Sequence, residues 1–193
     1  MIGPTPSIAP GDDGEVRQDP IRMHSYDPAW PSSFEDEARR LSGALQPWLV
    51  QPIEHIGSTA VPGLDAKPII DIVAVVADID SAATASEPLA SAGWIAAPEP
   101  TDAALRKLSF CTPSIAHRTH HLHVVEERSS GWRGWIAFRD HLRTHPDVAA
   151  EYGELKRRLA DAHGSDPNQR DAYRAGKAAW VAATTEAAMK GDS

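Results

Sequence analysis

The sequence has little cysteine and no long apolar segment. Cys111 is the only cysteine among 193 residues. A single cysteine excludes an internal disulfide framework and any multi-cysteine zinc or iron–sulfur site, and it predicts a reduced, cytoplasmic protein. No run of about eighteen apolar residues occurs, so no membrane-spanning helix is expected. The first residues also lack the basic and apolar segments of a secretory signal.

Positive charge is scarce in the first half of the chain. Residues 1–100 carry a net charge of −10, and residues 101–193 carry +2, which gives the total of −8. Without a strongly basic stretch, nucleic acid is not an expected partner. The lysines and arginines of the second half could instead bind a small anionic ligand.

The pattern along the chain predicts one α+β domain. Residues 1–22 contain four prolines and three glycines, which predicts a flexible tail ahead of a single domain over residues 23–190. Helices are predicted over 32–48, 81–92, 131–143, 146–164 and 167–180, and strands over 53–58, 69–76, 94–96, 105–111 and 120–126. Ser32 and Glu35 have the spacing of a capping box, and Gly93 is expected to end the second helix. The result is a small mixed sheet with an N-terminal helix and a C-terminal helical cluster.

A first group of candidate residues surrounds the segment IEHIGSTAVPGL. A strand that ends in Gly57-Ser58 exposes backbone N–H groups and a hydroxyl where no side chain blocks a phosphate. Asp71 interrupts an otherwise apolar strand, so its carboxylate needs a cation or an open strand end. The alternative is that Gly57 and Gly63 only form turns and that Asp71 caps a helix. GxxxxGK[ST] does not occur, which excludes a Walker phosphate loop.

A second group is a histidine cluster in a predicted strand. It comprises His117, His120, His121 and His123, beside Arg118. Because residues two apart share a face of a strand, His121 and His123 should point one way and His120 the other. Neutral imidazoles at this spacing can bind one divalent metal, with Asp71 as a third ligand if the two strands are adjacent. A single strand histidine is more often a hydrogen-bonded core residue.

A third group consists of cations on the C-terminal helices, namely Arg139, Arg143, Lys156 and Lys177. Cations on helices that face the edge of a sheet can bind phosphates through charge-assisted hydrogen bonds. The alternative is a solvated helix face with local ion pairs. Trp132, Trp135 and Trp180 are interpreted as packing residues.

Several long segments together resemble one known family. The segments YDPAWPSSFEDEARRL, IEHIGSTAVPGLDAKPIIDI, RTHHLHVV and WIAFRDHLRTHPDVAAEYGELKRRLA look like the GrpB family over about residues 24–182. That family is similar in fold to the nucleotidyltransferase superfamily, and some members are fused to dephospho-CoA kinase, where the domain is regarded as a folding accessory. The resemblance implies that Gly57 and Ser58 receive nucleotide phosphates and that Asp71 is a metal-binding carboxylate. The second carboxylate of the superfamily would stand at Val73, so this pattern is incomplete.

The first functional hypothesis is an enzyme that transfers a nucleotidyl group, AMP from ATP, to an unknown acceptor. Asp71, His121 and His123 would be catalytic and would hold one divalent cation, magnesium, manganese or zinc. The nucleotide would be bound by Gly57, Ser58, Lys67, Arg118, Arg139, Lys156 and Lys177. His55 is a candidate base.

The second hypothesis is a non-catalytic accessory or ligand-binding module with a degenerate site. Its partner would be a nucleotide or, in trans, a dephospho-CoA kinase. A third hypothesis, metal storage by the histidine cluster, is disfavoured by the single cysteine and the few ligands.

Overall fold

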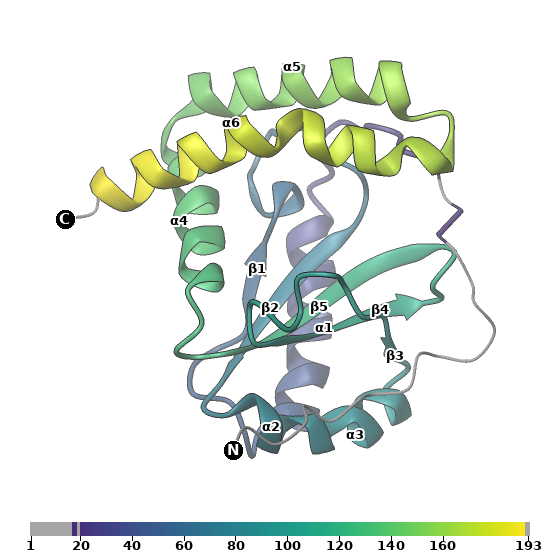
Figure 1. Ribbon diagram of the computed structural model, residues 1–193, viewed down its shortest axis with the longest axis vertical. Helices are drawn as coiled ribbons and strands as arrows, with labels where there is room; N and C mark the ends of the chain where they lie inside the picture. The colour runs from purple at the N-terminus through teal and green to yellow at the C-terminus, as the bar shows by residue number, and fades with distance from the viewer. Residues whose placement is uncertain (1–16, 19, 192–193) are drawn as a thin grey trace.

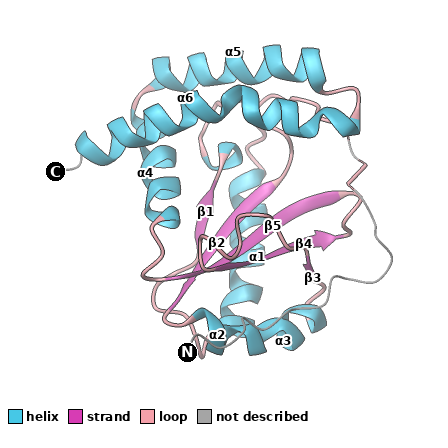
Figure 2. Ribbon diagram, in the orientation of Figure 1, coloured by secondary structure: helices cyan, strands magenta, loops and turns pink. Residues whose placement is uncertain are grey.

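The computed structural model describes residues 17, 18 and 20–191, which form one mixed α+β domain (Figures 1 and 2). The strands are β1 (Glu54–Ile56), β2 (Ile70–Val76), β3 (Ile95–Ala96), β4 (Lys107–Pro113) and β5 (Arg118–Glu126). They form a five-stranded sheet in the order β1-β2-β5-β4-β3. The central pair, β2 and β5, is parallel, and the other neighbouring pairs are antiparallel. The predicted fold class is confirmed.

The helices lie on both sides of this sheet. They are α1 (Trp30–Leu45), α2 (Ile79–Ala82), α3 (Ser86–Ser91), α4 (Gly131–Thr144), α5 (Pro146–His163) and α6 (Arg170–Gly191). In Figure 1, α1 lies behind the sheet and α2 and α3 lie at its lower end, whereas α5 and α6 run side by side across the top. No helix in the described ranges is long and apolar enough to cross a membrane.

The strand β2 is buried on both of its faces. Ile70 and Ile72 pack into a large core with α1 and α3, and Val73 and Val75 pack into a second core with Trp132 of α4. A strand buried on both faces needs apolar residues at consecutive positions, which explains its nearly continuous apolar sequence. The central strand predicted over 69–76 is therefore confirmed. Asp71, the polar residue within this apolar sequence, is the second residue of β2.

The start of α1 differs from the sequence prediction. The helix begins at Trp30, so Ser32 lies within the first turn and donates a hydrogen bond to the carbonyl oxygen of Ala29 (2.9 Å). Asp27 accepts a hydrogen bond from the backbone N–H of Ala29 at 2.8 Å, ahead of the helix. The capping box predicted at Ser32 and Glu35 is wrong, because a nearby Asx-type turn starts the helix two residues earlier.

Part of the predicted tail is bonded to the domain. Residues 1–16 and 19 lie outside the described residues, so the prediction of flexibility stands untested there. Arg17 and Ile21, however, are buried. The backbone N–H of Gln18 donates to the carbonyl of Ala116 (3.1 Å), and that of Ile21 donates to the carbonyl of Gly164 (2.9 Å). Residues 17, 18 and 21 of the predicted tail thus lie against the domain.

Candidate functional site

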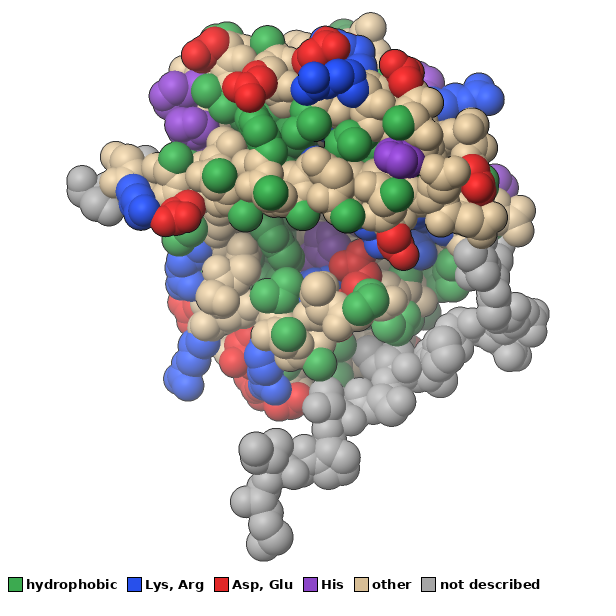
Figure 3. Space-filling view, turned by 45° about the horizontal axis from the view of Figure 1, so that its top comes forward, with side chains coloured by type: hydrophobic (Ala, Val, Ile, Leu, Met, Phe, Trp, Pro, Cys, Tyr) green, Lys and Arg blue, Asp and Glu red, His purple; other side chains and the backbone are tan. Residues whose placement is uncertain are grey.

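A cavity of about 440 Å³ lies between the sheet and α6. This volume falls within the range of small-molecule sites. Figure 3 shows the hollow on this face of the molecule, with histidine, acidic, basic and hydrophobic side chains visible in it. Eight of the ten predicted site residues line the cavity, namely Gly57, Ser58, Lys67, Asp71, His121, His123, Lys156 and Lys177.

An Asp–His pair forms part of the cavity wall. Because β2 and β5 are adjacent, Asp71 stands opposite His121 in the register, and its Oδ1 lies 2.9 Å from His121 Nδ1. The side chain therefore pairs with a histidine and does not cap a helix. Burial alone would raise the pKa of Asp71, but the hydrogen bond with His121 and the charge of nearby cations outweigh it and lower the pKa to about 2.

Gly57 makes room for this carboxylate. Its φ is +74°, and a Cβ atom at this position would lie 2.4 Å from Asp71 Oδ2. A side chain here would therefore collide with the carboxylate, and the backbone conformation itself favours glycine. Gly63 also has positive φ (+77°), but a Cβ there would meet open space. Gly63 is thus a turn residue, whereas Gly57 is required by the site.

Three lysines give the cavity an excess of positive charge. Lys156 Nζ donates to Ser58 Oγ at 2.9 Å and to the carbonyl oxygen of Asp65 at 2.5 Å. The Nζ atoms of Lys67 and Lys177 lie 5.6 and 5.3 Å from the ring centre of Tyr173. Burial, followed by the charge of neighbouring cations, lowers the pKa of both Lys67 and Lys156 to about 7. A bound anion would favour the charged ammonium form of both side chains and raise these two pKa values again.

His123 lies next to a network of hydrogen bonds around the buried side chain of Lys107. Its Nδ1 is 3.5 Å from Ser109 Oγ, and Lys107 Nζ donates to Ser109 Oγ, Glu99 Oε2 and Asp102 Oδ1 at 2.5 to 2.7 Å. Burial lowers the pKa of His123 to about 4, so its imidazole is neutral at pH 7. Sequence reasoning missed Lys107, since a lysine in a half-apolar strand gives no signal of its partners.

The residues predicted to hold a metal are not arranged as a set of metal ligands. Asp71 and His121 are bonded to each other, and the ring centres of His121 and His123 are 6.4 Å apart. Val73 is fully buried among apolar side chains, so it leaves no second carboxylate there. In the part of the chain that the structure describes, no three His, Cys, Asp or Glu residues could hold a metal ion. The divalent cation thus has no preformed site, and the metal assignment stays a prediction.

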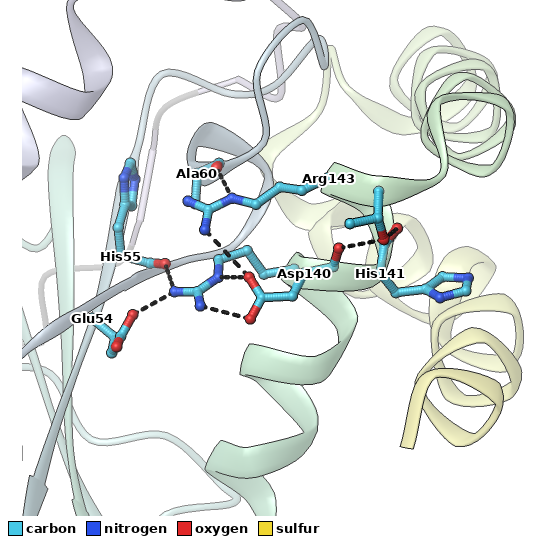
Figure 4. A network of polar contacts seen from close by, with 8 residues as sticks. Glu54, His55, Ala60, Asp140, His141 and Arg143 are labelled. Atoms are coloured by element: carbon cyan, nitrogen blue, oxygen red, sulfur yellow. Dashed lines mark hydrogen bonds and ion pairs between the residues drawn. The ribbon is translucent and has the colours of Figure 1, made fainter. Parts of the chain in front are cut away.

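Two predicted cations are not brought to the cavity. Arg139 Nη1 donates to Glu54 Oε2 at 2.6 Å and to the carbonyl of His55 at 2.9 Å, and its Nε and Nη2 bind Asp140. Figure 4 shows this network, which ties α4 to β1. Arg118 Nε donates to the carbonyl of Ile115 at 3.1 Å. Arg139 thus forms local ion pairs, as the alternative given for the helix cations allowed, and Arg118 binds a nearby backbone carbonyl.

Another arginine of α4 supports the loop that carries Gly57 and Ser58. Arg143 Nε donates to the carbonyl oxygen of Ala60 at 2.9 Å (Figure 4). Together with Arg139, which binds the carbonyl of His55, it holds the two sides of this loop against α4. From the sequence, Arg143 could either bind phosphate or form local ion pairs; in the structure it pairs with Asp140 and holds the backbone at Ala60.

His55, the candidate base, lies away from the cavity. Its ring stacks on Phe34 of α1 with a centre-to-centre distance of 4.8 Å, and its Nε2 is 3.0 Å from Thr59 Oγ1. Burial lowers its pKa to about 4. His55 is a neutral core residue in this structure.

The cavity also contains residues that the sequence did not single out as ligand contacts. They include Arg17, Glu99, Leu105, Trp135, Phe138, Tyr173 and Val181. Arg17 Nη1 lies 3.5 Å from His121 Nε2. The one available signal was on α6, where Tyr173, Lys177 and Val181 follow one another at steps of four and therefore share a helix face.

The comparison with known proteins agrees with the observed fold. A sequence model described as GrpB protein matches residues 20–187. The chain belongs to the GrpB family. The crystal structure of the conserved protein GrpB from Enterococcus faecalis matches with a TM-score of 0.77 and 33% sequence identity, over 88% of this chain and 98% of that one.

The family's relatives include longer proteins. The UPF0157 protein YqkA of Bacillus subtilis is 34% identical over 88% of this chain, which spans 48% of YqkA. A protein named dephospho-CoA kinase, from Mycolicibacterium paratuberculosis, is 29% identical over 86% of this chain, which spans 45% of that kinase. The chain thus spans about half the length of these two relatives, and the family link to a dephospho-CoA kinase is confirmed.

Proposed function

We propose that the cavity of this GrpB-family protein binds a nucleotide through its phosphate groups. The observation that carries this proposal is the gathering of Lys67, Lys156 and Lys177 on one cavity wall beside Gly57-Ser58. Among the described lining residues, the carboxylates are Asp71 and Glu99, and each already has a partner, His121 and Lys107 respectively. The three ammonium groups therefore lack a matching carboxylate within the cavity wall.

A polyphosphate suits this arrangement better than a single carboxylate does. Lysine is a point charge with three donors, and several lysines around one cavity can each bind a different phosphate oxygen. The Lys156 ammonium group is already held in place by Ser58 and by the carbonyl of Asp65. Little side-chain freedom is lost when this ammonium group binds an anion, which favours affinity.

Calorimetric titration of ATP, with and without manganese, tests the proposal. Wild type is expected to bind ATP in the micromolar range, about −8 kcal/mol. Replacing Lys177 with methionine (Lys177→Met) should weaken binding by at least about tenfold, since a hydrogen bond to a charged group contributes about 1.5–3 kcal/mol. Lys190→Met is the matched control on the same helix, because Lys190 is exposed and pairs with Glu186.

Three outcomes decide against the proposal. One is a wild type that does not bind ATP under either condition. Another is equal binding by wild type and Lys177→Met, with both proteins showing the same melting temperature. Equal losses in Lys177→Met and Lys190→Met would also contradict the proposal, because they would indicate only a general charge effect.

A second candidate function is metal-dependent transfer of a nucleotidyl group, here AMP from ATP. The observation that favours it is the ionised Asp71 carboxylate in the cavity wall, since a hard carboxylate oxygen is a ligand that magnesium and manganese accept. His121 and His123 would be the further ligands. Since the three side chains are not arranged as a ligand set in the described structure, a metal would have to break the bond between Asp71 and His121 and draw His123 toward them.

The variant Asp71→Asn separates the two functions. If the cavity only binds anions, loss of this negative charge should leave ATP affinity unchanged or raise it, because a carboxylate repels phosphate. If a metal ion bridges Asp71 and the phosphates, the part of the affinity that depends on manganese should disappear. Unchanged manganese dependence in Asp71→Asn would refute the metal assignment.

The similarity to a longer dephospho-CoA kinase supports a third role, as an accessory module that acts on such a kinase in trans. Co-purification of the tagged chain with the dephospho-CoA kinase of the same cell tests this role. Increased soluble yield or activity of that kinase in the presence of the chain is the expected result. No association and no change in yield would reject the accessory role.

A further inference from the structure

The cavity has a cationic end and an apolar end, arranged in order along α6. Four residues of α6 line it at steps of four, namely Tyr173, Lys177, Val181 and Thr185. With a rise of about 1.5 Å per residue, this row extends over about 18 Å. Tyr173 lies next to Lys67 and Lys177, whereas Thr185 packs toward Gly134 of α4. The polarity of the wall thus changes from one end of the row to the other.

The apolar end contains Trp135. The side chain of Trp135 lines the cavity together with Leu105, Phe138 and Val181. Its ring lies 5.3 Å from the ring of His123, at an angle of 52°. Leu105 approaches the same turn of α4, since its Cδ2 would be 3.2 Å from a Cβ atom on Gly131. In Figure 3, hydrophobic side chains border the hollow, and histidine, acidic and basic side chains are visible within it.

Trp135 lines the cavity, whereas Trp132, the neighbouring tryptophan of α4, does not. Trp132 is buried, donates its indole N–H to the carbonyl of Glu127 at 3.1 Å, and packs on Val73 and Val75. Trp135 packs in part against the same core, but it is only half-buried and lines the cavity. A large aromatic side chain at the edge of a polar cavity leaves apolar surface in water unless a ligand covers it.

We infer that Trp135 packs against a planar aromatic group of the ligand, so that the ligand is a nucleoside phosphate and not a polyphosphate alone. This inference rests on the proposed function, because it takes the lysine end as the phosphate site. Aromatic side chains bind nucleic-acid bases of every kind by stacking, because each base has a flat π-face. Lys177 and Val181 are one helical turn apart, so a single nucleoside phosphate can contact the cationic end and the apolar end of the cavity at the same time.

The test compares two probes that share the phosphates but not the base. ATP and inorganic tripolyphosphate are titrated calorimetrically into wild type, Trp135→Leu and Trp135→Phe. Wild type should bind ATP about tenfold more tightly than tripolyphosphate. Trp135→Leu should lose about this factor for ATP and keep its tripolyphosphate affinity. Trp135→Phe retains an aromatic face and should recover most of the ATP affinity.

The control variant is Trp48→Leu, because Trp48 packs against the core on the α1 side of the sheet. It should not change the affinity for either probe. Equal affinity of wild type for both probes, or equal losses for both in Trp135→Leu, would overturn the inference while leaving the phosphate site intact. Binding of neither probe to wild type would instead refute the proposed function, and the inference with it. Melting curves of each variant establish that it is folded.

Discussion

Replacing Gly57 with alanine should destabilise the protein, because two independent costs arise at this position. Gly57 has φ +74° and ψ −173°, a backbone region that is essentially restricted to glycine and costs about 1–3 kcal/mol for other residues. The added Cβ would also lie 2.4 Å from Asp71 Oδ2 and 3.1 Å from Asp71 Cβ. Overpacking of this kind adds about 1–3 kcal/mol. We expect Gly57→Ala to lower the free energy of unfolding by about 3 kcal/mol.

Two other glycines separate these costs. Gly63 has φ +77° but open space around its Cβ position, so Gly63→Ala should lose only the backbone contribution, about 1 kcal/mol. Gly43 lies within α1, also with open space, so Gly43→Ala should gain about 0.5–1 kcal/mol from helix propensity. The three variants should therefore rank, from most to least stable, as Gly43→Ala, Gly63→Ala and Gly57→Ala.

Urea denaturation and thermal melting measure this ranking. For a chain of this size, about 3 kcal/mol corresponds to a fall in Tm of roughly 10 °C. In Gly57→Ala the added Cβ should also displace the Asp71 carboxylate and break its bond with His121. If Gly57→Ala loses no more stability than Gly63→Ala, the close approach of Gly57 to Asp71 does not exist and the reasoning about the site is refuted.

Two further predictions concern buried ionisable groups. Lys107→Met should lower the free energy of unfolding by about 2 kcal/mol, because it leaves the carboxylates of Glu99 and Asp102 without their cation. Both carboxylates are partly exposed, which limits the cost. A change below about 0.5 kcal/mol in urea denaturation would contradict this prediction. The pKa of both His55 and His123 is lowered by burial to about 4, so between pH 6.5 and 4 the unfolded chain binds protons there and the folded chain does not. Stability should therefore fall as pH decreases through this window, and urea midpoints independent of pH from 7 to 4.5 would contradict it.

Most of the secondary structure could be predicted from local patterns. The apolar run 69–76 becomes β2, Gly93 follows the end of α3 as predicted, and a helical segment begins at Pro167, where the last helix was expected to start. Each of these features depends on the types and spacing of residues that are close together in the sequence, so local patterns are enough to predict it. The start of α1 was less predictable, because two competing side-chain interactions, at Asp27 and at Ser32, lie within a few residues of each other.

The candidate site was predictable only in part. The alternation of strand residues placed His121 and His123 on one face, and the polar interruption at Asp71 marked its strand as special. The cationic residues could not be sorted in this way. Arg139 and Lys177 are both charged residues of C-terminal helices, yet Arg139 bonds to Glu54 and Asp140 while Lys177 lines the cavity. Helical periodicity defines faces of a helix but not what each face will meet.

By itself, the sequence determined the order of the elements, the family, and the residue types available for binding an anion, because each of these depends on composition, local spacing or long continuous motifs. The tertiary structure alone decided that Asp71 and His121 are paired, since that requires β2 and β5 to be parallel neighbours in one register. It also decided that Trp135 borders the cavity while Trp132 belongs to the core. Such distinctions depend on how helices pack against a sheet, and no local pattern specifies a contact between residues that are far apart in the chain.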